Sequence, residues 1–282
     1  MDRAVTKTKI SAREALEPSW LRPQSVVFTL LAEHLLGKSR GVFSGSFIDV
    51  LGRVGISEHA TRSTLARMAS RGLLARTRRG RKIYFAMTPR CVAILEDGWR
   101  RIWEIGAVNR EQNADWTLLA FSLPEAWRRE RYDLRSRLTW AGFGSLQNGM
   151  WLAPAPVDIS PIVGELELAG HVWAFRVRAL PPSAPASVIR ATFDLDALAR
   201  RYREFARYWE RRAEAQPDAL VLSLRLSTQW LRIIRADPRV PVQLLPEDWP
   251  AISAQQLFRS LHGAHRKRAQ ALARELLDTI DI

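Results

Sequence analysis

One stretch decides how the first third of the chain folds. It reads Gly55-Ile56-Ser57-Glu58-His59-Ala60-Thr61-Arg62-Ser63-Thr64-Leu65-Ala66-Arg67-Met68, followed by Arg71 and Gly72. Gly55 permits a tight turn, and Ser57 is a good N-cap for a helix that begins beside it. Thr61, Leu65 and Met68 recur at helical spacing and are expected to face inward. The stretch therefore predicts a short amphipathic helix that directly follows a turn.

The outward face of this helix carries side chains that suit DNA. Guanidinium groups can bond bidentately to guanine edges, and hydroxyls can bond to bases or phosphates. Another amphipathic helix, which Ser46 is expected to cap, precedes the turn at Gly55. Two helices joined by a short Gly-containing turn are typical of a helix-turn-helix. The alternative is the solvated face of an ordinary amphipathic helix.

The residues after the helix predict a basic β-hairpin. Strand-like runs at 73–77 and 82–87 flank the turn Arg78-Arg79-Gly80-Arg81. Five of the seven residues from 76 to 82 are basic. A helix-turn-helix followed by such a hairpin is the winged variant, whose wing follows phosphates or enters the minor groove. The combination favours DNA binding over a solvated helix face.

We therefore expect a defined set of side chains to contact DNA. They are Ser57, His59, Arg62, Ser63, Arg67 and Arg71 on the helix, and Arg78, Arg79, Arg81 and Lys82 on the hairpin. Arg62, Ser63 and Arg67 would face the major groove. A homodimer would read a pseudo-palindromic double-stranded operator, because two-fold symmetry in the protein is matched by symmetry in its site.

The distribution of charge supports this placement. The 282 residues include 43 basic and 29 acidic side chains, a net charge of +14. Residues 1–110 hold 20 of the bases and 9 of the acids, a net charge of +11, which leaves +3 for the remainder. A compositional bias toward arginine would affect both parts alike. A basic segment beside a nearly neutral one indicates a polyanion-binding unit attached to something else.

Other features of the composition exclude several classes of protein. A single cysteine, Cys91, excludes a disulfide framework and multi-cysteine metal sites. No apolar run approaches the ~18 residues of a membrane span, and the start lacks a signal-peptide pattern. We expect a cytoplasmic protein without a membrane partner.

The pattern along the chain predicts an α+β protein of three units after a polar arm at 1–19. A winged helix-turn-helix domain is expected at 20–105. Strand, helix, strands, helix and strand at 115–182 suggest a ferredoxin-like domain, and prolines at 181, 182 and 185 mark its exit. Helices at 190–282 are expected to serve dimerisation and regulation.

No catalytic pattern stands out, so we expect neither an enzyme nor a cofactor or metal. Phosphate-binding glycine loops, Gly-x-Ser-x-Gly and His-Glu-x-x-His are missing. A metal-dependent nuclease needs carboxylates around a cation, but the first strand of the middle unit ends in Ser122-Leu123-Pro124. His262 and His265 precede three basic residues and are expected on a solvated face. A general nucleic-acid-binding or architectural protein, RNA binding included, remains the alternative.

Four stretches, in the same order along the chain, resemble the PaaX family of transcriptional repressors, whose namesake regulates phenylacetic acid degradation. They are the 55–72 stretch with the Arg79-Gly80-Arg81 turn; Trp116 with Gly142-Phe143-Gly144 and Gly149-Met150-Trp151-Leu152-Ala153-Pro154; Asp194-Leu195 through Arg201-Tyr202; and Asp237-Pro238 with Leu244-Leu245-Pro246-Glu247-Asp248-Trp249-Pro250. The last stretch is the most specific.

The resemblance implies a repressor in three parts. A winged helix would read the operator of an aromatic-acid catabolic operon, the middle would resemble a CRISPR-associated nuclease fold, and the helical part would help to dimerise. An aryl-acyl coenzyme A thioester would release the DNA. The chain departs from the family pattern at Thr228-Gln229-Trp230 and at Ala251, and these departures leave open which ligand it binds.

Overall fold

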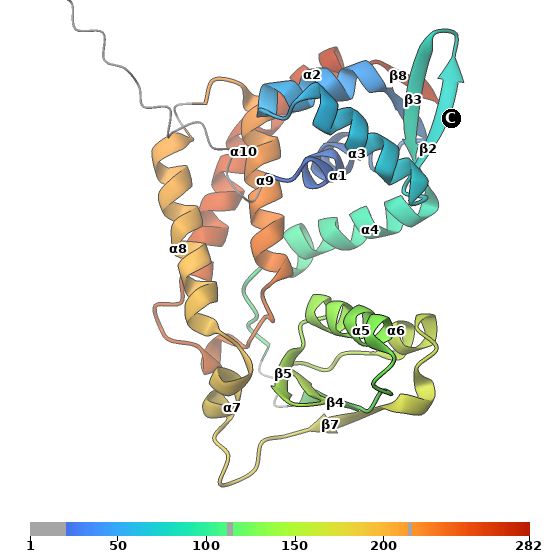
Figure 1. Cartoon of the computed structure of the whole chain (residues 1–282). Helices are drawn as coiled ribbons and strands as arrows, with labels where there is room; N and C mark the ends of the chain where they lie inside the picture. Colours follow the sequence, from blue (N-terminus) through green and yellow to red (C-terminus); the bar gives the residue numbers. More distant parts are fainter. Residues whose placement is uncertain (1–20, 112–114, 214–215) are drawn as a thin grey trace, which may run out of the picture.

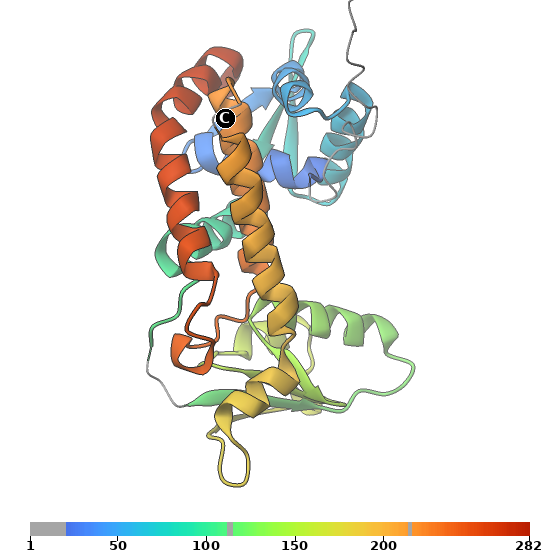
Figure 2. The same cartoon turned by 90° about the vertical axis from the view of Figure 1, so that its left-hand side faces the viewer.

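The computed structural model describes residues 21–111, 115–213 and 216–282 (Figure 1). The arm expected at 1–19 lies outside the described residues. The described chain has a helical part with a small sheet at the top of Figure 1 and an α/β part at the bottom. Long helices run along one side between them (Figure 2). The fold mixes helices and antiparallel sheets, as the sequence predicts.

The first part contains the stretch that the sequence singles out. Its elements are α1 (Pro23–His34), β1 (Arg40–Phe43), α2 (Ser44–Val54), α3 (Glu58–Ser70), β2 (Leu74–Arg79) and β3 (Lys82–Met87). Gly55 ends α2 in the left-handed region, with a φ of 100°, which favours glycine. The expectation that Ser46 caps α2 is wrong. The helix begins at Ser44, and the Ser46 hydroxyl accepts a hydrogen bond from the backbone N–H of Asp278 (3.0 Å).

A strand from far along the chain, β8 (Thr279–Asp281), completes the sheet of this part in the order β2-β3-β1-β8. It pairs with β1 in antiparallel fashion, and the Phe43 N–H donates to the carbonyl of Asp278 (2.9 Å). The sequence does not predict β8, because three residues are too short to show an alternating pattern.

Helix α4 (Pro89–Arg100) leads from the hairpin toward the middle part. Thr88 caps it by accepting a hydrogen bond from the Cys91 N–H (3.3 Å), and Pro89 occupies its first turn. Beyond Arg100 the helix continues as a π-helical segment, Arg101–Ile105.

The middle part has the element order that the sequence predicts. It consists of β4 (Trp116–Phe121), α5 (Arg128–Trp140), β5 (Gly144–Gln147), β6 (Met150–Ala153), α6 (Ser160–Glu165) and β7 (Val172–Val177). The strands form an antiparallel sheet in the order β5-β6-β4-β7. Leu119 of β4 packs with Leu134 and Leu138 of α5 in a buried core between helices and sheet.

The last part is helical and shares a core with the first. It contains α7 (Pro185–Thr192), α8 (Leu195–Arg212), α9 (Ala219–Arg235) and α10 (Ala251–Leu276). Helix α7 is not predicted, because prolines at 181, 182 and 185 suggest a loop, whereas Pro185 in fact fits the first turn of a helix. Leu220 and Leu224 of α9 pack with Leu30 of α1, whereas Trp230 stacks on Phe258 of α10 (centroids 4.9 Å apart). One helix thus serves two cores.

Candidate nucleic-acid interface

The inner face of α3 is held by packing. Thr61, Leu65 and Met68 are at most 1% exposed, as their spacing predicts. Ser57 caps the helix, since its Oγ accepts a hydrogen bond from the backbone N–H of Ala60 (3.3 Å). The Ser57 hydroxyl is therefore engaged at the start of the helix, next to the positive end of the helix dipole.

The outer face of α3 presents the polar residues that the sequence predicts there. His59, Arg62 and Arg67 are exposed, Ser63 is half-buried, and Arg71 is exposed at the C-terminal end of the helix. Each of these five side chains lies three or four residues along the chain from another one. They form one continuous surface because residues three and four apart are neighbours on a helix.

Two arginines on this face are oriented by neighbouring side chains. Arg67 donates hydrogen bonds to the hydroxyls of Ser63 and Thr64, the latter at 3.0 Å, and these neutral partners leave its charge uncompensated. Arg62 forms an ion pair with Glu58 (2.7 Å), in which both side chains are about 60% exposed. Such a pair is worth only about 0.3–0.5 kcal/mol. Arg62 can therefore exchange Glu58 for a phosphate.

The β2–β3 hairpin carries its basic side chains away from the core. Arg79 pairs with Lys82 across a turn in which Gly80 has a φ of 59°. Both faces of the outer half of β2 are largely exposed, and Figure 1 shows the hairpin projecting beyond the helices. Its exposed bases are Arg76, Arg78, Arg79, Arg81 and Lys82.

Lys82 differs from the other hairpin bases. Its ammonium lies 2.7 Å from Oδ2 of Asp278 and 5.0 Å from the centroid of the Phe43 ring. The hydrogen bond and the charge of Asp278 raise the pKa of Lys82. The sequence could not reveal this partner, because it lies 196 residues away along the chain.

The charge of this surface is largely unbalanced. Between Ser57 and Met87 there are eight basic residues and one acidic residue. In the described part of the chain, only Arg62 and Lys82 of these eight lie in ion pairs. The six others, Arg67, Arg71, Arg76, Arg78, Arg79 and Arg81, have no carboxylate within ion-pair distance there. The helix and the hairpin together form a basic surface, which we call the α3–hairpin surface.

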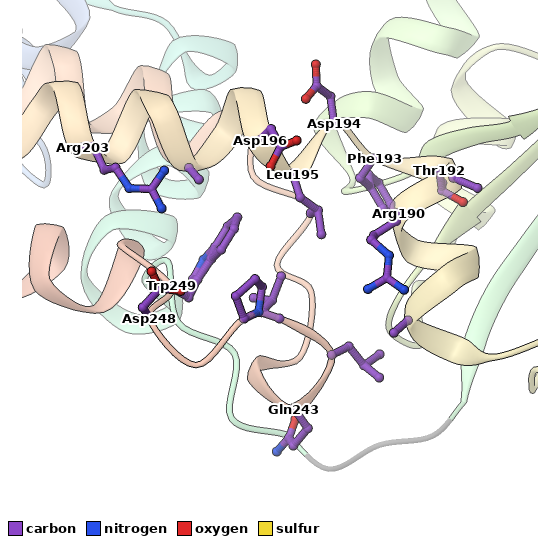
Figure 3. Close-up of a pocket in the computed structure, with 16 residues that line it drawn as sticks. Arg190, Thr192, Phe193, Asp194, Leu195, Asp196, Arg203, Gln243, Asp248 and Trp249 are labelled. Carbon is purple, nitrogen blue, oxygen red and sulfur yellow. The ribbon is translucent and has the colours of Figure 1, made fainter.

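A cavity of about 720 Å³ lies in another part of the molecule, between the end of α7, the start of α8 and residues 243–249 (Figure 3). Trp249 and Phe193 provide aromatic walls. Figure 3 shows Arg203 of α8 and Arg190 of α7 on either side of it. Asp194, Asp196 and Asp248 also line it. Its volume lies in the range of small-molecule sites, about 300–1,000 Å³.

The acidic side chain next to the first strand of the middle part is engaged in an ion pair. Asp115, at the start of β4, accepts a hydrogen bond from Arg178, which holds the pKa of the carboxyl below its usual value. Among residues 21–111, 115–213 and 216–282, no three or more His, Cys, Asp or Glu side chains are grouped to hold a metal ion. No helix in these ranges is both long and apolar enough to cross a bilayer.

The expectation that His262 lies on a solvated face is wrong. Its side chain is only 6% exposed, and Nε2 lies 3.6 Å from Oε1 of the buried Glu33 on α1. A 26-residue helix places His262 on its inner face, although charged residues follow at 266–268. His265 is half-buried on the same helix.

Comparison with known families identifies the class of protein to which this three-part chain belongs. Residues 22–91 match the PaaX-like protein family, residues 109–189 the PaaX protein central Cas2-like domain, and residues 193–275 the PaaX-like protein C-terminal domain. Because the three matches follow in order and cover most of the chain, the protein belongs to the PaaX family.

Two individual proteins are similar over most of their length. The transcriptional repressor PaaX of Escherichia coli (strain K12) is 23% identical over 270 residues, which cover 90% of this chain and 84% of the repressor. The solved structure of the uncharacterized protein Rv0674 from Mycobacterium tuberculosis has a TM-score of 0.58 and 23% identity. That match covers 90% of this chain and 99% of the other. The structural likeness supports the fold.

Proposed function

We propose that this protein is a sequence-specific DNA-binding transcriptional repressor and that its α3–hairpin surface is a winged helix-turn-helix. The observation that carries the proposal is the set of six arginines on α3 and the hairpin with no carboxylate partner in the described chain. When a surface of this charge binds DNA, its arginines displace the counterions that are condensed on the phosphates. The release of these ions favours association. The repressor function of the related Escherichia coli protein supports the same assignment.

Within this proposal the two halves of the surface have different roles. Arg67, oriented by two hydroxyls, reads base edges in the major groove with Arg62 and Ser63. His59 and Arg71 flank them on α3, and Ser57 contacts DNA through its backbone at the helix N-terminus. Arg78, Arg79 and Arg81 contact phosphates or the minor groove. Lys82 joins them only when it exchanges Asp278 for a phosphate.

A homodimer would present two such surfaces to a pseudo-palindromic operator. Footprinting on the DNA upstream of the protein's own and neighbouring genes tests this. A discrete, two-fold symmetric footprint is expected. Diffuse protection that ignores sequence, or preferential binding of RNA, would favour a general nucleic-acid-binding protein instead.

We further propose that an aryl-acyl coenzyme A thioester binds the cavity of Figure 3 and releases the operator, as in a repressor of an aromatic-acid catabolic operon. Arg190 and Arg203 suit phosphates, and Trp249 and Phe193 suit flat rings. A ligand changes operator affinity only if its own affinity differs between the DNA-binding arrangement of the protein and an arrangement that does not bind DNA.

The test measures operator affinity at fixed salt with and without a panel of thioesters. We expect an aromatic thioester to weaken operator binding at least tenfold, an effect that Arg203→Ala abolishes. Arg211→Ala, at the other end of α8, is the control. Thioesters that leave affinity unchanged would contradict the effector but not the repressor.

A further inference from the structure

The two edges of the sheet in the middle part differ in how far they are protected. At the edge formed by β5, the register shifts between Ser145 and Gln147, and the end of α7 lies against Gly144. Irregular registers and covering elements keep a sheet edge from pairing with other strands. At the opposite edge, β7 pairs with β4 over six consecutive residues without a register shift. No described strand pairs with the outer side of β7, so this edge is open to a further strand.

The open strand also carries large apolar side chains on its surface. Trp173 is 53% exposed and Phe175 is 51% exposed. They are two residues apart and therefore lie on the same face of the sheet. Seven large apolar side chains are exposed in the described chain, and β7 with the segment after it contributes three of them, Leu180 being the third. Such a concentration is typical of a surface that another protein covers.

The backbone of β7 offers hydrogen-bonding groups along the same edge. Residue pairs in an antiparallel ladder alternate between a hydrogen-bonded and a non-hydrogen-bonded type. The Ser122 N–H donates to the carbonyl of His171 (3.1 Å), in register with the pairing of β4 and β7. Every second residue from His171 onward therefore directs its N–H and C=O toward β4. The intervening residues direct theirs outward, where another strand can pair with them: Val172, Ala174 and Arg176.

We propose that two copies of this chain join their sheets at β7, with the two β7 strands antiparallel around a two-fold axis at Ala174. In this pairing Ala174 meets its own counterpart, and Val172 meets Arg176 of the second copy, so that all the outward-directed backbone groups of the strand are used. Trp173 lies opposite Phe175 of the second copy in a pair of the closer, non-hydrogen-bonded type. The two-fold axis repeats this contact, which gives two aromatic pairs that stabilise the joined sheet.

The charges at the ends of β7 favour a second copy as the occupant of this edge. Arg176 lies near the C-terminal end of the strand, and Glu167 lies shortly before its N-terminal end. Both side chains are exposed, and neither lies in an ion pair within the described chain. In the antiparallel arrangement the C-terminal end of each strand lies beside the N-terminal end of the other, so Arg176 and Glu167 approach each other twice. Opposite charges across an interface select the register and the partner.

The symmetry of this dimer suits the proposed function, on which the inference rests for its need of a homodimer. The two-fold axis of an antiparallel strand pair is perpendicular to the sheet. Figures 1 and 2 show the first part of the protein on the side of the sheet that α5 covers. The rotation therefore leaves both α3–hairpin surfaces on the same side of the joined sheet, where one operator can contact both. Dimerisation is thereby assigned to the middle part rather than to the C-terminal helices.

The test measures the oligomeric state of the full chain by analytical ultracentrifugation without DNA, so that its outcome does not depend on operator binding. The wild type is expected to be a dimer at micromolar concentration. Ala174→Pro removes an outward N–H and places a ring at the two-fold axis, and should yield monomers. Trp173→Ser should weaken dimerisation about tenfold. Tyr132→Ser, which removes a 73% exposed aromatic side chain from α5, is the control and should have no effect.

Thermal unfolding verifies that the variants are folded. A monomeric wild type, which would leave β7 to a strand of another protein, would overturn the proposal. A dimer that persists in folded Ala174→Pro and Trp173→Ser would also overturn it. If Ala174→Pro does not fold, Trp173→Ser and the cross-link described below decide the question. The footprint on the operator decides the proposed function separately.

Charge reversal tests the antiparallel arrangement. Arg176→Glu and Glu167→Arg should each weaken dimerisation about fivefold, because each places like charges beside one another. The double variant restores opposite charges and should return the dimer to within about twofold of the wild type. Loss of dimerisation in the double variant equal to the sum of the single losses would contradict the arrangement.

A cross-link tests the position of the two-fold axis. Residues of a hydrogen-bonded antiparallel pair have Cα atoms about 5.5 Å apart, within the range of a disulfide. Mild oxidation of Ala174→Cys should therefore give a covalent dimer that dithiothreitol reverses. The native Cys91 is fully buried, and Tyr132→Cys on α5 is the control for random collision. Equal cross-linking of Ala174→Cys and Tyr132→Cys would refute an axis at Ala174.

Discussion

Helix α8 and the α3–hairpin surface both display exposed arginines, yet they differ in what surrounds the charge. Helix α8 carries six arginines and three acids along one element, and its inner face, with Tyr202, Phe205 and Trp209, is buried in the C-terminal core. The α3–hairpin surface carries eight bases and one acid on two elements, one of which projects from the body. The number of arginines alone does not distinguish the two regions. They differ in the local balance of basic and acidic residues and in the projection of the hairpin from the body.

Under the proposed function, α8 has a structural role and α3 with the hairpin binds DNA. Figure 1 supports the division, because α8 lies on the opposite side of the molecule from the hairpin. A polyanion held by α3 and the hairpin would therefore not reach the outer face of α8. Five substitutions or sets of substitutions test this contrast, and they are given in decreasing order of expected effect.

The largest effect is expected from removing three hairpin charges together. Arg78, Arg79 and Arg81 changed to Gln should lower the slope of log K against log salt by about 2.7 and weaken binding on the order of 100-fold near physiological salt, for operator and scrambled DNA alike. The matched variant changes Arg200, Arg207 and Arg211 of α8 to Gln, which removes the same charge. It should lose less than about threefold in fluorescence anisotropy titrations. Equal losses would refute the contrast.

Changing a single base-reading side chain should have a smaller, sequence-dependent effect. Arg67→Ala is expected to cost about 1–3 kcal/mol on the operator and to reduce its preference over scrambled DNA, because an edge-reading guanidinium is lost. Arg79→Ala should weaken both DNAs equally. Competition binding measures both ratios. If Arg67→Ala also weakened the two DNAs equally, Arg67 would be a phosphate contact.

A substitution on the inner face of α8 should affect stability and leave DNA binding unchanged. The Tyr202 hydroxyl donates to the buried carboxylate of Asp237. Tyr202→Phe leaves that carboxylate without the donor and should lower the free energy of unfolding by about 1–3 kcal/mol. Urea denaturation measures this loss, and operator affinity of the folded protein serves as the control. Weaker DNA binding at full stability would contradict a structural role for α8.

The buried carboxyl of Asp237 should make the stability of the protein depend on pH. Burial raises the pKa of Asp237 to about 6, above its ordinary value of 3.8. The folded state therefore binds this proton more tightly than the unfolded state, so the contribution of Asp237 to stability increases as pH falls through 6 and is complete below about 3.8. Between pH 7 and pH 5 the gain is about 1 kcal/mol. In Asp237→Asn the free energy of unfolding, measured by denaturation at each pH, should no longer show this gain between pH 7 and pH 5. If the gain persists in the variant, Asp237 is not its source.

The smallest change should strengthen binding. Asp278→Asn removes the carboxylate that holds Lys82 and frees this base for phosphate, which should raise affinity about two- to fivefold and steepen the salt slope by up to about 0.9. Asp281→Asn is the charge-matched control: it removes the exposed partner of Arg40 from β8, three residues further along the chain, and should change affinity less. A loss of affinity in Asp278→Asn would show that Asp278 supports the hairpin rather than competing with DNA.

Local signals in the sequence predicted local structure well. The Ser57 cap and the inward spacing of Thr61, Leu65 and Met68 define α3 without reference to any other segment. The turn at Gly80 defines the hairpin. Such features depend on residues within a few positions of one another, and their physical causes are visible in the sequence.

Contacts between residues far apart along the chain could not be predicted from the sequence. The burial of His262 depends on Glu33, the pairing of Lys82 on Asp278, and the role of Ser46 on the same distant segment. Nothing near those residues signals these contacts, because each is created by the packing of α10 and β8 against the first part. The cavity of Figure 3 likewise appears only when the end of α7, the start of α8 and residues 243–249 come together.

The strand β8 has a consequence for how the protein is made. It pairs with β1, and Asp278, the residue before it, donates a hydrogen bond to Ser46, which is synthesised 232 residues earlier. During synthesis on the ribosome, the edge of β1 therefore remains without its β8 partner until almost the whole described chain has emerged. Unpaired sheet edges recruit other strands, so a stalled or truncated product is exposed to aggregation. Only a chain translated through β8 closes the sheet from which the hairpin extends.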